Sequence, residues 1–286
     1  MKRLGVLANC RKPEAAAALK RLTGYADKLG LELLVCDETA RALPGSHKVA
    51  PGKLAGRIDA LLALGGDGTL LHGARLLAGS EVPVLGVNLG QLGFLTSVRE
   101  DDLERALQSL IQDRYTTSVR AVAECRLIRR KKVLGRYRAL NDIVIGWGAS
   151  SRLMTLNLLI DGEQVASYHC DGLIVATPTG STAHALSAGG PILHPDCPCF
   201  VVCAICPHTL SNRPLVLSDQ KQVTVEVTRT ASHLLLSVDG QEEPSVELGD
   251  RVEIRRSPHS VRLVLLPEYS YFSVLRQKLN WRGSSV

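Results

Sequence analysis

The residues best suited to chemistry lie first in a short glycine-rich segment, Gly65-Gly66-Asp67-Gly68-Thr69. It follows an apolar run at 58–64 and precedes a helix-like stretch at 69–77. Glycines let the backbone approach an anion and adopt positive φ, and Thr69 is placed to cap a helix whose free amides favour phosphate. A carboxylate such as Asp67 repels a polyphosphate unless it holds a metal or takes a proton from an attacking hydroxyl. The segment therefore predicts phosphoryl transfer.

The same five residues are compatible with an ordinary strand-to-helix turn, in which glycine supplies the bend and Asp67 caps the helix. A second segment, 171–190, shifts the balance between these readings. It joins an apolar strand to a cluster of small hydroxylated residues. Small residues let a ligand approach the backbone, and hydroxyls and amides suit the edges of a base or a sugar. The two segments together favour a nucleotide site.

The elements that must position these segments change character along the chain. The first part alternates between strand-like runs at 4–8, 31–35, 58–64 and 82–87 and helix-like runs at 13–29, with Gly30 as its stop, and at 101–111. This order predicts a parallel sheet with a crevice at the carboxyl ends of its strands, where the glycine loop lies. The residues after the first strand, 9–13, lack the Gly-x-Gly-x-x-Gly fingerprint of dehydrogenases.

The second part reads as successive strands separated by turn signals such as Asp161-Gly162 and Asp239-Gly240. The expected strands cover 119–129, 137–145, 152–160, 223–227, 234–238, 251–254 and 261–266. We therefore expect an α/β domain at 1–115, completed by a helix-containing tail at 268–286, and a mainly β domain at 116–267.

The composition bounds the function. With 286 residues and 45% hydrophobic content, the chain can bury a sizeable core in two modest domains. Aromatic residues make up only 4%, which weighs against binding of single-stranded nucleic acid. The net charge of +6 is densest at 126–138, a cluster compatible with attraction of nucleotides or with a solvated hairpin.

No apolar run is long enough to span a bilayer, and the N-terminal apolar run is too short for a signal sequence. We expect a cytoplasmic protein with no membrane partner, in which the eight cysteines are reduced. Cys197, Cys199, Cys203 and Cys206 have spacings like those of a metal or iron–sulfur site, but the continuous apolar run 200–206 favours a buried strand in which cysteine is a small hydrophobe.

The chain resembles the NAD kinases over almost its whole length. The glycine loop is shared with diacylglycerol-type lipid kinases and, in similar form, with phosphofructokinases, whereas the segment 171–190 is not. The segments that carry the resemblance are 65–69, 86–96, Asn141-Asp142, 171–190, 205–210 with Arg213-Pro214, and 238–241. The resemblance implies an α/β domain with a parallel sheet, like that of NAD kinases and diacylglycerol kinases, followed by a mainly β domain.

The activity implied by the resemblance is transfer of the γ-phosphate of ATP, with Mg²⁺ or another divalent cation, to the 2′-hydroxyl of the adenosine ribose of NAD, giving NADP. Asp67 would orient and deprotonate that hydroxyl. An unperturbed Asp has a pKa of about 3.9, so it would accept the proton only as the bond to phosphorus forms. The residues implied to cradle the donor phosphates are Gly65, Gly66, Gly68 and Thr69.

The same resemblance implies contacts to NAD. Phe94 would pack near the adenosine, and Asn141 and Asp142 would hold its ribose, with Asp142 in place of the family's usual glutamate. The residues matching positions that contact adenine are Thr182, Ala183, His184 and Ser187; the family usually has tyrosine where this chain has His184. Asp171 and His208 match positions at the nicotinamide end, which in this family lies across a subunit boundary, so a homodimer or homotetramer is implied.

Two other functions stay open. A lipid kinase of the diacylglycerol kinase type would need an apolar substrate mouth, and the polar residues 177–187 line one poorly. A noncatalytic NAD-binding regulator would bind the ligand without using Asp67. The choice between ATP and inorganic polyphosphate as donor, and between NAD and NADH as acceptor, does not follow from any motif.

Overall fold

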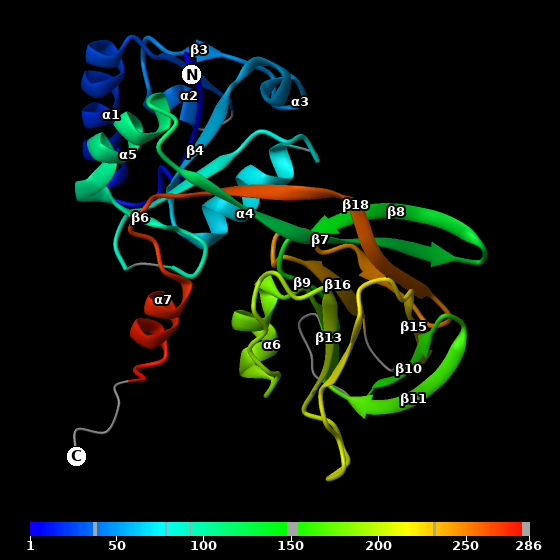
Figure 1. The fold of residues 1–286 in the computed structure, drawn as a ribbon. Coiled ribbons are helices and arrows are strands. Elements are labelled where there is room, and N and C mark those ends of the chain that lie inside the picture. The colour runs from blue at the N-terminus through cyan, green and yellow to red at the C-terminus, as the bar shows by residue number, and fades with distance from the viewer. Residues whose placement is uncertain (37–38, 78, 92, 148–153, 231–232, 282–286) are drawn as a thin grey trace, which may run out of the picture. The chain divides into compact units, whose positions relative to one another are not determined.

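The fold is that of a computed structural model, which describes residues 1–36, 39–77, 79–91, 93–147, 154–230 and 233–281 (Figure 1). Three residues of the sequence patterns, Leu92, Arg152 and Leu153, lie outside these ranges. The chain divides into two compact units, Met1–Val119 with Val261–Val286, and Arg120–Ser260. Within the described ranges, no helix is long and apolar enough to cross a membrane.

The first unit is built on a parallel sheet, as the sequence predicted. Its strands follow the order β5-β4-β1-β2-β3, and β6 and the end of the long strand β18 both pair with β5. The strands are β1 (Arg3–Ala8), β2 (Glu32–Val35), β3 (His47–Lys48), β4 (Ala60–Gly65), β5 (Val84–Asn88), β6 (Val98–Arg99) and β18 (Arg251–Leu265). Every pair among them in this unit is parallel.

Helices cover both faces of this sheet. α1 (Ala15–Leu29) and α5 (Leu103–Ile111) bury their apolar residues in one cluster with alternate residues of the central strands, such as Leu62 and Leu85. On the other face, α4 (Asp67–Leu76) approaches so closely that a Cβ at Gly73 would lie 2.9 Å from Leu61. α1 ends at Gly30 with φ of 66°, the left-handed stop that the sequence predicted.

Shorter elements complete this unit. They are α2 (Thr39–Ala42), α3 (Pro51–Leu54), the 3₁₀ turns η1 (Ala55–Arg57) and η2 (Glu100–Asp102), and α7 (Tyr271–Lys278) in the tail. α7 begins at a side-chain cap, because Ser270 Oγ accepts a hydrogen bond from the Ser273 amide at 3.3 Å.

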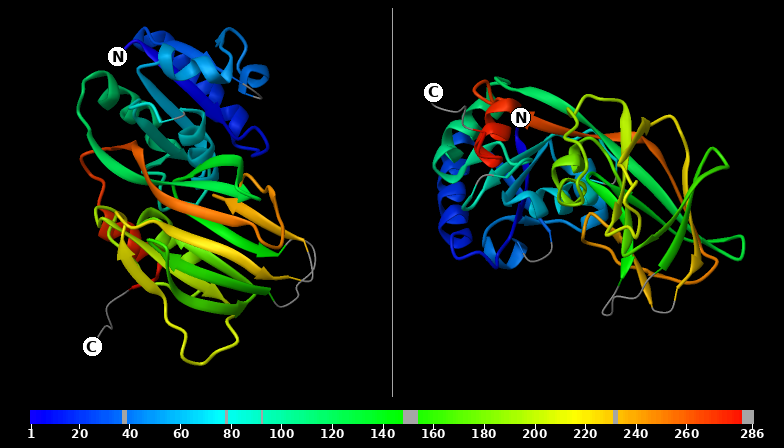
Figure 2. Two further views of the ribbon diagram at one scale, coloured as in Figure 1. Left: turned by 90° about the vertical axis from the view of Figure 1, so that its right-hand side faces the viewer. Right: turned by 90° about the horizontal axis from the view of Figure 1, so that it is seen from below.

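The second unit is mainly β, as predicted, and Figure 2 shows its strands from two further sides. One antiparallel sheet has the order β14-β13-β12-β9-β16-β17. Its strands are β14 (Leu215–Ser218), β13 (Cys199–Ile205), β12 (Gly172–Ala176), β9 (Asp142–Trp147), β16 (Leu234–Val238) and β17 (Ser245–Val246). The short helices η3 (Thr179–Thr182) and α6 (His184–Ser187) follow β12.

The other strands of this unit are β7 (Thr116–Arg129), β8 (Lys132–Ala139), β10 (Met154–Ile160), β11 (Glu163–Cys170), β15 (Val223–Arg229) and the first part of β18. They pair in the order β11-β10-β15-β18, and the hairpin β7–β8 joins through β7. Two predicted boundaries were wrong. The expected strand 137–145 is split between β8 and β9, and the expected strands 251–254 and 261–266 are one strand, β18.

Three residues of the basic cluster at 126–138 form ion pairs within the protein. Arg126 pairs with Glu253 at 2.5 Å, Arg129 with Asp250 at 2.8 Å, and Arg138 lies 4.0 Å from Glu124. These contacts favour a structural role for these three arginines, whereas Lys131, Lys132 and Arg136 are exposed. Cys203 is buried in β13, where burial raises the pKa of its thiol to about 11. A thiol with such a pKa stays protonated and behaves as a small apolar side chain.

Candidate active site

The glycine loop connects β4 to α4 at the carboxyl edge of the parallel sheet. α4 begins at Asp67, and Gly66 at its N-cap is extended, with φ of −157°. None of Gly65, Gly66 and Gly68 has positive φ, so the expectation that these glycines serve a left-handed backbone was wrong. Thr69 lies inside the first turn of α4 and does not cap the helix, which has no side-chain cap.

Packing explains one of the three glycines. A Cβ at Gly65 would lie 2.1 Å from Thr69 Oγ1, so only glycine fits there. At Gly66 and Gly68, nothing within 4 Å opposes a Cβ. Neither backbone strain nor packing demands glycine at these two positions. We infer that glycine is used there because it leaves open space beside the first turn of α4. This space lets an anion approach the N-terminus of the helix, where the helix dipole favours negative charge.

Asp67 is held by the segment after β5. Its Oδ1 accepts hydrogen bonds from the amides of Leu95 and Thr96, both at 3.1 Å, and from Thr96 Oγ1 at 3.3 Å. Its Oδ2 accepts one, from the Phe94 amide at 2.8 Å. A carboxylate offers about four acceptor sites, two on each oxygen. Oδ1 is therefore saturated, and Oδ2 keeps one lone pair for a further donor.

Thr96 is the hub of this arrangement. Its hydroxyl donates to Asp67 and accepts from Asn88 Nδ2 at 3.0 Å and from the Gly93 amide at 3.1 Å. One donor and two lone pairs are all that a hydroxyl has, so its orientation is fixed. A Cβ at Gly93 would lie 1.9 Å from Asp67 Oδ1. The absence of a side chain at Gly93 therefore makes room for the carboxylate.

A lysine lies across the same edge of the sheet. Lys12 Nζ, from the loop after β1, donates to the carbonyl of Gly65 at 3.3 Å and to the carbonyl of Leu89. These contacts place a positive charge between the loops that follow β4 and β5. An ammonium carries three donors, so one remains beyond the two carbonyls.

In the second unit, Asn141 and Asp142 are fixed by Asp239. The Asp239 carboxylate accepts from the amides of Leu140 and Asn141, both at 2.8 Å, and of Asp142 at 3.1 Å. Asn141 Oδ1 is buried and accepts no hydrogen bond within the described part of the chain. Such a buried acceptor calls for a donor from a ligand or water.

Asp142 is 6% exposed. Burial, with the Asp239 carboxylate adding to it, raises the pKa of Asp142 from 3.8 to about 7, although the backbone N–H of His184 donates to it. This hydrogen bond brings Asp142 together with the start of α6. The family resemblance implies that both parts of the chain contact NAD.

The hydroxylated segment after β12 serves two purposes. Thr177 Oγ1 donates to the Leu140 carbonyl at 2.6 Å, and Ser181 Oγ donates to the Pro178 carbonyl at 2.6 Å. Both residues are buried, so these hydroxyls hold the segment in place. The sequence had suggested instead that the hydroxyls of this segment face a ligand. The four residues expected at adenine are more accessible: Thr182 and Ala183 are half-buried, and His184 and Ser187 are exposed.

Asp171 and His208 are brought near each other but not to Asn141 and Asp142. The Asp171 amide donates to the Ile205 carbonyl and the His208 amide to the His169 carbonyl, at 2.9 and 2.8 Å. Asp142 pairs with Ala176, at the other end of β12. Ala176 lies five residues after Asp171 along an antiparallel strand. The residues Asp171 and His208 therefore lie roughly 17 Å from Asn141 and Asp142.

Several residues of this arrangement have no role in the sequence-based prediction. Lys12, Asn88, Gly93 and Thr96 surround the glycine loop and Asp67, and Asp239 holds the Asn141 segment. Asn88, Gly93, Thr96 and Asp239 fall inside segments that carry the family resemblance, which was the available signal. Nothing in local pattern marks Lys12.

Comparisons with known proteins cover both units. The family model described as the ATP-NAD kinase N-terminal domain matches residues 4–115, and that of the ATP-NAD kinase C-terminal domain matches residues 140–266. A protein named NAD kinase from Syntrophotalea carbinolica is 40% identical over 282 residues, covering 98% of this chain and 99% of that protein.

Two solved structures are also similar. A yeast NADH kinase complexed with NADH matches with a TM-score of 0.91 and 27% identity, covering 99% of this chain and 89% of that chain. An NAD kinase from Archaeoglobus fulgidus in complex with ATP matches with a TM-score of 0.77 and 25% identity, covering 98% and 100%.

Proposed function

The chain belongs to the NAD kinase family, and we propose that it transfers the γ-phosphate of ATP to the 2′-hydroxyl of the adenosine ribose of NAD, giving NADP and ADP. The observation that carries this proposal is Asp67: a carboxylate at the N-terminus of α4, beside open glycines, with one oxygen saturated by hydrogen bonds and the other still able to accept one.

In the proposed reaction, the ribose hydroxyl donates to Asp67 Oδ2. Its oxygen attacks the γ-phosphorus, the bond from that phosphorus to the β,γ-bridging oxygen breaks, and the hydroxyl proton passes to Oδ2. An alcohol is far too weak an acid to lose its proton to a carboxylate beforehand, so transfer accompanies bond formation. The four hydrogen bonds fix where Oδ2 lies, and positioning supplies much of the rate.

The phosphate chain would meet the first-turn amides of α4 at Gly66 and Gly68, with Thr69 in the same turn and Gly65 holding its packing. The third N–H of Lys12 adds a positive charge at the same edge of the sheet. These donors suit the charge that develops on the phosphoryl oxygens.

A divalent metal would fit this site only when it is bound to the phosphates of the donor. Among the described residues, no three Asp, Glu, His or Cys side chains converge on a metal position, and Asp67 already accepts four hydrogen bonds. Mg²⁺ would therefore be held chiefly by donor phosphates, as is usual for nucleotide-bound Mg²⁺, and it would neutralise their charge.

NAD would be held mainly by the second unit. The buried, unpartnered Asn141 Oδ1 and the Asp142 carboxylate suit the hydroxyls of a ribose, and Thr182, Ala183, His184 and Ser187 offer an accessible surface beside them for adenine. Phe94 is half-buried next to Asp67 and would pack on the adenosine. His184 stacks with less area than the usual tyrosine, which weakens NAD binding.

The nicotinamide end would be read by Asp171 and His208 of another protomer, because those residues lie at the far end of β12 from Asp142. A homodimer or homotetramer is the corresponding assembly. We also propose a cytoplasmic location, supported by eight cysteines that are all free thiols.

The function is tested by incubating the purified protein with NAD, ATP and Mg²⁺ and assaying NADP with an NADP-specific dehydrogenase, together with ADP. Equal amounts of both products are expected. ADP without NADP would contradict the proposal. NAD binding with neither product would favour the noncatalytic regulator, and phosphorylation of diacylglycerol instead of NAD would favour the lipid kinase.

A further inference from the structure

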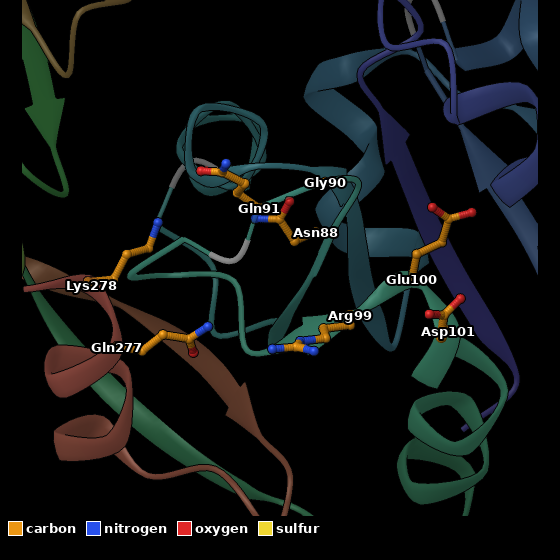
Figure 3. A pocket seen from close by; sticks show the side chains of 8 residues that line it. All are labelled: Asn88, Gly90, Gln91, Arg99, Glu100, Asp101, Gln277 and Lys278. Carbon is orange, nitrogen blue, oxygen red and sulfur yellow. The ribbon is translucent and has the colours of Figure 1, made fainter. Parts of the chain in front are cut away.

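The cavity in Figure 3 lies in the first unit, where Asn88 at its wall pairs with Gly65 of the glycine loop. It therefore belongs to the site described above. The long hairpin of β7 and β8 (Figure 1), whose tip lies in the second unit, does not. Residues 116–139 of this hairpin lie between the two ranges that the family models match, and the proposed reaction gives them no role.

The hairpin ends in a two-residue turn made of cations. Arg129 pairs with Lys132, so Arg130 and Lys131 form the turn, with φ of 48° and 66°. Left-handed turns of this kind are usually made by Gly, Asn or Asp, because other side chains crowd the backbone. Arg130, Lys131 and Lys132 are all exposed. Exposed cations thus occupy a strained turn, which points to a use for charge at this place.

Two large apolar side chains follow the turn on β8. Ile128 pairs with Val133 and Leu127 with Gly135, which leaves Leu134 as the extra residue of a β-bulge. A regular strand turns neighbouring side chains to opposite faces, and the bulge interrupts that alternation. Val133 is 44% exposed and Leu134 51%. The hairpin tip, residues 130–134, therefore presents two apolar side chains directly after three cations.

A third exposed apolar side chain lies in a turn that is tied to the base of this hairpin tip. Arg129 binds Glu247 at 2.6 Å and Asp250 at 2.8 Å. Leu248, between these two acids in the chain, is 62% exposed. The same ion pairs neutralise both acids, so neither offsets the charge of the tip.

The charge of the hairpin tip is uncompensated. Residues 126–138 contain no Asp or Glu, and three of their arginines are paired as described above. Within the described part of the chain, no ion pair involves the other cations of this segment, which are Arg130, Lys131, Lys132 and Arg136. Such a surface attracts anions, and salt weakens the attraction.

We propose that the hairpin tip binds the surface of an anionic lipid bilayer, with its cations at the headgroups and Val133, Leu134 and Leu248 in the outermost acyl region. A bilayer offers negative charge and an apolar interior within one surface, which matches the two kinds of side chain at the tip. Contact at the surface needs no spanning segment. It therefore revises the expectation of no membrane partner, which rested on the lack of a long apolar run.

Two other partners match the hairpin tip less well. Nucleic acid offers phosphates to the cations, but its backbone gives exposed apolar side chains nothing to contact. A second copy of this chain, joined through the same tip, would bring like charges face to face.

The test is co-sedimentation of the full-length protein with vesicles of phosphatidylcholine alone, or of phosphatidylcholine and phosphatidylglycerol in equimolar mixture. The parent should bind the mixed vesicles only, and less strongly as salt rises. The double variant Lys131→Gln, Lys132→Gln should weaken this binding about 30-fold. Val133→Ser should weaken it about tenfold.

Matched controls make the same changes elsewhere. The double variant Lys20→Gln, Lys53→Gln removes two exposed lysines of the first unit, and Val165→Ser replaces a valine of β11 that is 50% exposed. Both controls should bind the mixed vesicles as the parent does. NADP formation without vesicles should be the same in all four variants.

The proposal fails if the parent does not bind the mixed vesicles, if it binds both kinds equally, or if the controls lose as much binding as the tip variants. Tighter binding to duplex DNA than to mixed vesicles, lost in the double variant of the tip, would identify nucleic acid as the partner instead. A changed oligomeric state of Val133→Ser on gel filtration would make the tip a contact between copies. Sedimentation does not depend on turnover, so these outcomes are separate from the test of the proposed kinase activity.

Discussion

At the scale of single residues, the site depends on how one carboxylate is held. Asp67 receives all its hydrogen bonds from residues 27 to 29 positions later in the chain, and the Thr96 hydroxyl adds the contact that ties this segment to Asn88. Thr96 therefore positions the Asp67 carboxylate, a role distinct from any contact with substrate.

Replacing Thr96 by valine removes the hydroxyl at nearly constant volume. Because hydrogen bonds to charged groups contribute about 1.5–3 kcal/mol, kcat should fall about 10- to 100-fold with little change in the KM for NAD. Thr96→Ser keeps the hydroxyl and should restore most of kcat. Steady-state kinetics of the two variants check this, and equal loss in both would show that packing of the methyl group matters instead.

Gly93→Ala tests the room left for the carboxylate. The new Cβ would lie 1.9 Å from Asp67 Oδ1, so the carboxylate must move. A displacement of about 1 Å can cost roughly 100-fold in rate, and a loss of that size in kcat is expected. Gly24→Ala is the matched control, since nothing within 4 Å opposes its Cβ and it should leave kcat unchanged. Equal activity of the two variants would contradict the close contact.

Asp142 carries a pH dependence. Its pKa is raised from 3.8 to about 7 in the folded protein, so the native state binds more protons than the unfolded state across that window. The free energy of unfolding therefore falls as pH rises from about 4 to about 7, by at most about 4 kcal/mol. Asp142→Asn removes the charge, so urea unfolding without ligand should show its stability relative to the parent rising from pH 4 to pH 8. A difference independent of pH would contradict the shift.

At the scale of elements, close backbone approach shapes the NAD side of the site. The turn η3 packs so tightly on the Asn141 segment that a Cβ at Gly180 would lie 2.1 Å from the Asn141 carbonyl oxygen. Backbone atoms cannot step aside as a flexible side chain can. The geometry of Asn141 and Asp142 thus depends on this glycine.

Gly180→Ala should lower the free energy of unfolding by about 1–3 kcal/mol and raise the KM for NAD. Gly56→Ala, at an open position, is the control for the added methyl group. Thermal unfolding and steady-state kinetics measure both effects. A variant as stable as the control would show that the contact relaxes without cost.

Sequence patterns located the elements better than their boundaries. The alternation of apolar strands and helices predicted the parallel sheet, and Gly30 marked the end of α1. The break between β8 and β9 at Leu140-Asn141 contains no glycine or proline, so nothing in the local pattern separated the two strands. The single strand β18 runs through Pro258, a residue type usually kept out of central strands, and joins two runs that were predicted as separate strands.

The same limit applies to the site. Asp67 was identifiable because a carboxylate is unusual in a phosphate loop. The hydrogen bonds that hold it, and the contact of Lys12 with Gly65 across 53 residues, join segments distant in the chain and follow from the sheet order. The roles of Asn141, Asp142 and the residues at 182–187 came from family resemblance and stay predictions.

At the scale of the whole molecule, each unit carries a distinct part of the proposed reaction. The first unit holds the acid and the phosphate loop, and the second holds the surface expected to bind NAD. Variants should therefore separate by substrate. Asp142→Ala should raise the KM for NAD about tenfold and leave the KM for ATP unchanged. Titrations of this variant with each substrate check this, and an equal rise in both KM values would contradict the division.

The most direct test of the central claim is the rate of phosphoryl transfer in Asp67→Asn, measured by rapid quench in a single turnover with saturating NAD, ATP and Mg²⁺. Asparagine keeps the shape of the side chain but cannot take the ribose proton. We expect NADP formation to slow by about 10²- to 10⁴-fold while the Kd for NAD stays within about threefold. A transfer rate within about tenfold of the parent would show that Asp67 does not accept that proton.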